Sequence, residues 1–115
     1  MKDVSGNISY NGRDYKLVFN LNVMERIQEE YGTLDKWGEL TDGSTGEPNA
    51  KAIKFGFTEM INEGIEMENE QNGTDIKPFT EKQVGRIITE IGLANVVDTV
   101  NTTVINSTKD DGKNV

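Results

Sequence analysis

Carboxylates are the most plentiful side chains in this sequence that could do acid–base or metal chemistry. The 115 residues include 20 Asp and Glu against 12 Lys and Arg, with no histidine and no cysteine. The usual general base near neutral pH and the commonest zinc ligand are therefore missing. Disulfides and thiol nucleophiles are excluded as well. A catalytic or metal site would have to rely mainly on Asp and Glu.

The spacing of the carboxylates does not predict such a site. Glu59 and Glu63 lie four residues apart on a predicted helix, where they repel each other by a few tenths of a kcal/mol. A catalytic pair needs one buried carboxyl with a raised pKa, and nothing in the sequence predicts that burial. The segment DGSTGE, residues 42–47, has the order of neither a calcium loop nor a phosphate loop. We expect no catalytic, cofactor-binding or metal-binding residue and no enzyme activity.

The net charge and the hydropathy of the sequence argue against nucleic acids and membranes as binding partners. The net charge of −8 repels phosphate backbones, so we expect no nucleic-acid binding. No apolar run approaches the ~20 residues of a membrane span, and the N-terminus lacks the apolar stretch of a secretion signal. The sequence predicts a cytoplasmic protein without membrane contact.

The segment SYNGRDYKLVF, residues 9–19, predicts a β-hairpin. Asn11-Gly12 is the strongest short-range signal for a type I′ turn, because both central residues of that turn need positive φ. This turn pairs Tyr10 with Arg13 and places Leu17 opposite Gly6 on an apolar face. An isolated hairpin is marginal in water, so we expect it to pack on other elements.

The rest of the chain predicts about four helices. Asn22 and Glu25 resemble a capping box, and Gly32 ends that helix. Leu34, Trp37 and Leu40 then indicate a short helical turn after Thr33. The longest helix is expected over residues 49–66, with Pro48 suited to its first turn and a loop in the later part of 63–78.

Two further helices are expected near the C-terminus. Thr80 and Gln83 form a capping box, and Gly92 ends the helix that it starts. Over residues 93–107 the β-branched content favours a strand and the apolar spacing favours a helix, which we prefer. The apolar residues of that spacing are Leu93, Val96, Val97, Val100 and Val104. The predicted fold class is α+β, mainly α, with residues 1–106 as one domain and 107–115 as a disordered tail.

Two aromatic residues are candidate partner-binding residues. A domain of this size cannot bury every apolar stripe completely, and Trp37 and Phe55 fit the predicted stripes least well. Exposed aromatics are typical anchors for protein partners, whereas burial in the core is the alternative. This signal favours a protein-interaction module over an enzyme.

The order of these features resembles a known family. ISYNGRDYKLVFNLNVMERIQEEYGTL, residues 8–34, resembles the start of the small tail assembly chaperones of long-tailed bacteriophages and prophages. In those proteins a hairpin with an NGK-x-Y-x-L-x-F-like second strand leads into a helix that ends near YG. FTEMINEGIEM followed by FTEKQVGRIITEIG is similar to their helix, polar loop and Thr-capped helix. The similarity spans roughly residues 5–95, and Arg13 stands where Lys is commoner.

The resemblance implies a non-enzymatic role in virion assembly. Such proteins bind the tape measure protein, keep it soluble, and help the tail tube protein to polymerise around it, with self-association possible. They act in the host bacterial cytoplasm and are absent from the mature virion. The alternatives are a structural tail or head–tail subunit, or a small bacterial adaptor domain.

Overall fold

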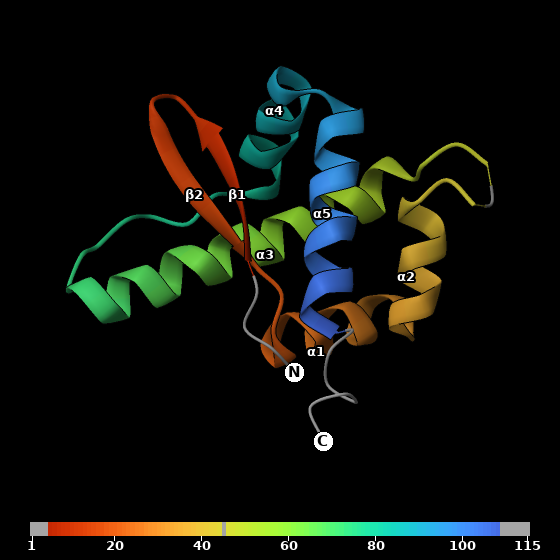
Figure 1. The fold of residues 1–115 in the computed structure, drawn as a ribbon, viewed down its shortest axis with the longest axis horizontal. Coiled ribbons are helices and arrows are strands. Elements are labelled where there is room, and N and C mark those ends of the chain that lie inside the picture. The colour runs from red at the N-terminus through yellow and green to blue at the C-terminus, as the bar shows by residue number, and fades with distance from the viewer. Residues whose placement is uncertain (1–4, 45, 109–115) are drawn as a thin grey trace.

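The computed structural model describes residues 5–44 and 46–108, which form a two-stranded hairpin and five helices (Figure 1). The elements are β1 (Ser5–Tyr10), β2 (Arg13–Val18), α1 (Leu21–Tyr31), α2 (Leu34–Thr41), α3 (Ala50–Asn72), α4 (Glu81–Ile91) and α5 (Leu93–Thr108). The predicted α+β, mainly α class is confirmed, and the expected short turn after Thr33 is a helix of 8 residues, α2.

The hairpin has the predicted turn and register. Asn11 has a φ of 56° and Gly12 a φ of 79°, both positive as a type I′ turn requires. Tyr10 pairs with Arg13 and Gly6 with Leu17 in the antiparallel ladder. Leu17 is buried, so the apolar face of the hairpin packs into the core as expected.

Two helices pack on the hairpin, α3 against β2 and α5 against β1 (Figure 1). The register leaves the carbonyl oxygen of Lys16 on the outer edge of β2, where it faces Gly64 of α3 so closely that a Cβ on Gly64 would collide with it. On β1, a Cβ added to Gly6 would lie 2.7 Å from Oγ1 of Thr103 in α5. Glycine is therefore required at both contacts by close approach.

Helix α1 begins earlier than predicted. The N-cap is Asn20, whose side chain accepts a hydrogen bond from the amide of Val23, so the expected capping box of Asn22 and Glu25 is wrong. The side-chain amide of Asn20 also donates to Glu63 of α3 at 2.7 Å, and Asn22 donates to the same carboxylate. This contact with α3 favours Asn20 as the cap. Gly32, with a φ of 91°, ends the helix as predicted.

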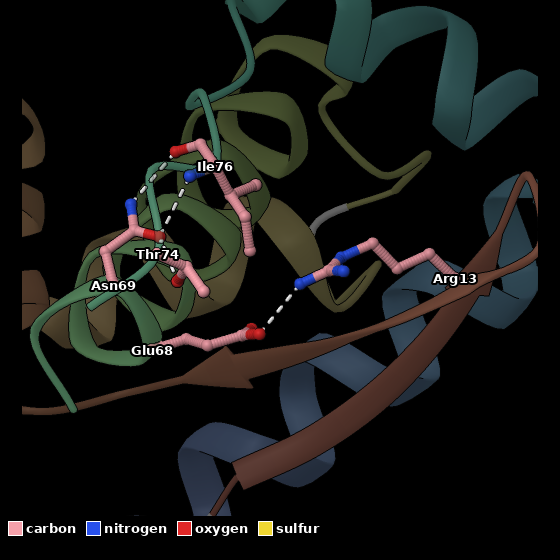
Figure 2. Close-up of polar contacts among 5 residues, drawn as sticks. All are labelled: Arg13, Glu68, Asn69, Thr74 and Ile76. Carbon is pink, nitrogen blue, oxygen red and sulfur yellow. Dashed lines mark hydrogen bonds and ion pairs between the residues drawn. The ribbon is translucent and has the colours of Figure 1, made fainter. Parts of the chain in front are cut away.

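Helix α3 is longer than the predicted 49–66 and ends at Asn72. Asn49 caps it, so Pro48 lies before the cap and not in the first turn. Its last turns are held by polar contacts, which Figure 2 shows: Glu68 accepts from Arg13 at 2.8 Å, and the side chain of Asn69 bonds to both backbone groups of Ile76. Thr74 also donates to Asn69. These contacts explain why an acidic, aperiodic segment remains helical.

The C-terminal helices agree with the sequence in type and in their shared boundary. The capping box of Thr80 and Gln83 is present, and Gly92 alone separates α4 from α5. Residues 93–107 are helical, as preferred over a strand. However, α5 continues to Thr108, so the first two residues of the predicted tail are helical and the rest lie outside the described residues.

Replacing Gly64 by Ala should test the contact between β2 and α3. We expect Gly64→Ala to lower the free energy of unfolding by about 1–3 kcal/mol, because the new methyl group must displace the backbone of β2. Gly38→Ala in α2 is the matched control, since a Cβ there meets nothing within 4 Å. It should be neutral or stabilise by up to about 1 kcal/mol. Equal effects in chemical denaturation would contradict the close contact.

Candidate functional site

The carboxylates that the structure describes are not grouped as a metal site requires. Within residues 5–44 and 46–108, no group of three Asp or Glu side chains is placed to hold a metal ion. Glu59 and Glu63 lie one helical turn apart but have different partners. Glu59 lies 3.7 Å from Arg26, whereas Glu63 accepts hydrogen bonds from two asparagine side chains. Glu59 thus connects α3 to Arg26 of α1, and Glu63 connects α3 to Asn22 of α1 and to Asn20, the N-cap of α1.

Glu59 is nevertheless more buried than the sequence suggested. Burial raises the pKa of its carboxyl above the ordinary value of 4.5, and Glu81 and Glu63 raise it further, against the opposing effect of Arg26. The charged groups that act on it are Arg26, Glu63 and Glu81. We therefore interpret Glu59 as part of an ion-pair cluster between α1 and α3.

Glu59→Gln should make the protein more stable near neutral pH and have little effect in acid. Because the folded-state pKa is raised, stability is fully present below the ordinary pKa and falls as the pH rises towards the folded value. The glutamine cannot ionise, so it avoids this loss. Thermal unfolding of both proteins at pH 4 and pH 7 measures the difference. A gain at pH 4 equal to that at pH 7 would contradict the raised pKa.

Trp37 does not lie on the surface, contrary to the expected exposure. Only 1% of the residue is exposed, and its indole N–H donates to the carbonyl oxygen of Ala52 at 2.9 Å. The ring packs so tightly on α3 that a Cβ on Gly56 would collide with it. Trp37 therefore fastens α2 to α3 as a core residue.

Phe55 is buried as well, although its side chain points away from the apolar stripe expected for its helix. Its ring lies edge-on to Tyr31, with ring centroids 5.7 Å apart, and the guanidinium of Arg26 lies over it at 5.7 Å. The stripe misled the prediction because α3 packs against α1, α2 and α4 as well as against β2. A central helix buries residues all round. The exposure that made Trp37 and Phe55 candidate anchors is absent.

Trp37→Ala should therefore behave as a core substitution. We expect it to destabilise the domain by about 3–5 kcal/mol through lost burial and the cavity left against α3. Trp37→Phe keeps most of the volume and loses the hydrogen bond to Ala52, so it should cost less. Urea denaturation measures both values. Unchanged stability in Trp37→Ala would contradict this packing.

The structure places an apolar surface groove elsewhere, where α3 begins, α4 ends and α5 begins. Its central hollow has a volume of about 580 Å³. It is lined by Ala50, Lys51, Lys54, Gly85, Ile88, Thr89 and Leu93. A neighbouring hollow of about 380 Å³ is lined by Pro48, Leu93, Ala94, Val97, Asp98 and Asn101. We call these two hollows together the Leu93 groove.

Leu93 belongs to both hollows and is 44% exposed. Val97, one turn further along α5, is half-buried beside it. Sequence reasoning assigned both residues to the packed face of their helix. The spacing identifies an apolar face, but it does not indicate where along the helix the neighbouring elements stop covering that face. The groove thus combines a small apolar surface with a hollow shape, which makes it a candidate binding site.

A separate hollow, of about 340 Å³, lies outside the Leu93 groove, between the polar face of the hairpin and the end of α3. Its lining includes Asp14, Lys16 and Glu68 together with uncharged polar side chains. Because both signs of charge alternate around it, this hollow indicates no particular ligand. The Leu93 groove is the better candidate site.

Comparisons with protein-family models, with curated proteins and with solved structures found no match to this chain. Among the described residues, no helix has the length and apolar character needed to cross a membrane.

Proposed function

We propose that this protein is a non-enzymatic tail assembly chaperone of a long-tailed bacteriophage or prophage. In this role it binds the tape measure protein, keeps it soluble and promotes polymerisation of the tail tube protein. It acts in the cytoplasm of the host bacterium and leaves before the virion is complete.

The observation that carries the proposal is the order of elements along the chain. Strand β2 leads directly into α1, which ends at Tyr31-Gly32. Helix α3, a polar loop and the Thr80-capped α4 follow. This is the order that the resemblance to tail assembly chaperones implies, and it supports the proposal beyond the similarity of short sequence segments.

The character of the surface gives a second line of support. A net charge of −8 favours solubility, and the Leu93 groove provides an apolar surface for a protein partner. A long helical client that aggregates through its apolar faces needs a partner with both properties. In contrast, Glu29, Glu59 and Glu68 pair with arginines, and Glu63 accepts a hydrogen bond from the cap residue Asn20.

Co-expression with the client tests the proposal. The proposal predicts that a very long tape measure protein is encoded downstream of the gene for this chain, and that protein is the candidate client. We expect the soluble fraction of that protein to rise severalfold when this chain is co-expressed, and the two to purify together. An unchanged soluble fraction would contradict the proposal.

Analysis of purified virions distinguishes the structural alternative. A chaperone should be absent from the particle, so mass spectrometry of purified virions should detect no stoichiometric amount of this chain. A fixed copy number in the particle would instead identify a structural tail or head–tail subunit.

A further inference from the structure

The Leu93 groove and the hollow that continues it along α4 are lined by more cations than carboxylates, although the whole chain is acidic. This third hollow, of about 470 Å³, shares Gly85 and Thr89 with the central one. Four cations line the three hollows, namely Lys51, Lys54, Lys82 and Arg86. Only two carboxylates, Glu90 and Asp98, accompany them. A chain with 20 acids and 12 bases therefore carries a locally positive surface at its apolar groove.

These four cations are available to a partner. Within residues 5–44 and 46–108, none of them takes part in an ion pair; the recorded pairs use Arg13 and Arg26. Lys51, Lys82 and Arg86 are exposed. Lys54 is half-buried, and a Cβ on Gly85 would lie 3.5 Å from its Cδ, so its aliphatic stem lies along α4. The stem extends the apolar floor while the ammonium group stays at the rim.

Two helix N-termini add to the positive field. Ala50 and Leu93 are the first residues of α3 and α5, and both line the central hollow. The positive ends of the two helix dipoles therefore lie at the groove, where they favour negative charge. The negative end of α4 lies at the same junction, so the preference for a negative partner rests mainly on the side-chain cations.

We infer that the Leu93 groove docks an amphipathic helix whose apolar face is flanked by Asp and Glu. The apolar face would contact Leu93 and Val97, and the flanking carboxylates would meet the cations of α3 and α4. Apart from Pro48, the described residues that line the groove belong to helices, so these walls present no strand edge that could pair with an extended peptide. A helix satisfies its own backbone, so it fits such walls best.

This inference deepens the proposed function because it names the kind of client segment that is recognised. It rests on the proposed function only for the identity of the natural partner. The net charge of −8 repels an acidic helix from most of the surface. The groove attracts it. The docking position is therefore specified by charge as well as by apolar contact.

Two synthetic peptides test the inference without the natural client. Both carry leucines at helical spacing; one has Glu on the flanks and the other has Lys. Fluorescence anisotropy should show the acidic peptide binding at least about tenfold more tightly, with an affinity that falls as salt is added. Equal binding of the two peptides would overturn the inference.

Matched variants locate the binding site. Leu93→Ser should weaken binding of the acidic peptide by about tenfold or more, as expected for an apolar anchor. Leu21→Ser is the control, because Leu21 is also the first residue of a helix, lies outside the groove and is 70% exposed. It should leave the affinity unchanged. Equal losses in both variants would overturn the assignment.

Charge-reversal variants test whether the lysines around the groove contribute to binding. Combining Lys51→Glu with Lys82→Glu should weaken the acidic peptide and strengthen the basic one. Lys36→Glu in α2, an exposed lysine away from the groove, should do neither. Thermal melts of all variants check that each remains folded. An unaltered preference in the double variant would contradict a role for these cations.

The outcomes separate this inference from the proposed function. If the tape measure protein co-purifies equally with wild type and Leu93→Ser, the chaperone role stands and the groove assignment fails. If the acidic peptide binds but the tape measure protein does not, the groove assignment stands and the chaperone role fails. Self-association that Leu93→Ser abolishes, without peptide binding, would assign the groove to a second copy and overturn the inference.

Discussion

The arrangement of the whole domain depends on the close contact between two backbones, the outer edge of β2 and Gly64 of α3. The carbonyl oxygen of Lys16 occupies the space that any other side chain at position 64 would need. Since an exposed strand edge invites pairing with other chains, the helix also protects β2. The ion pair of Arg13 and Glu68 extends the contact along α3. With α5 packed on β1, both strands of a hairpin that is unstable alone gain a helical partner.

Features set by local chemistry could be predicted from the sequence. The Asn11-Gly12 turn fixes the register of the hairpin because the positive φ angles and the two-residue loop leave one pairing. Thr80 and Gln83 likewise identify the start of α4 because both capping bonds lie within four residues. In α5, the helical spacing of the apolar residues predicted the structure better than the β-branched content did. In each case, residues adjacent in sequence decide the structure.

Features set by tertiary contacts could not be predicted. Asn20 caps α1 because Glu63, 43 residues away, also bonds to it, and no local rule prefers it to Asn22. Phe55 is buried because α3 packs against α1, α2 and α4 as well as against β2, so a search for one apolar stripe assigns it wrongly. Leu93 shows the opposite error, since a residue on an apolar face remains exposed where covering elements end. The candidate site was therefore missed, although the residue types that form it were recognised.

The separation between core and groove follows from how the domain uses its apolar residues. Its single tryptophan packs α2 against α3, and Phe55 packs α3 against α1. Among the described residues, the large apolar side chains that remain exposed are aliphatic: Leu21, Leu93 and Ile105. Leu93 lies where three helix ends meet. Lys51 and Lys54 lie at that junction with two helix N-termini, and Lys82 and Arg86 follow along α4. Apolar and positively charged side chains thus lie together on a part of the surface outside the packed core. A partner bound there would gain contact area and charge complementarity without disturbing the packing around Gly64, so recognition and stability can be altered separately in this fold.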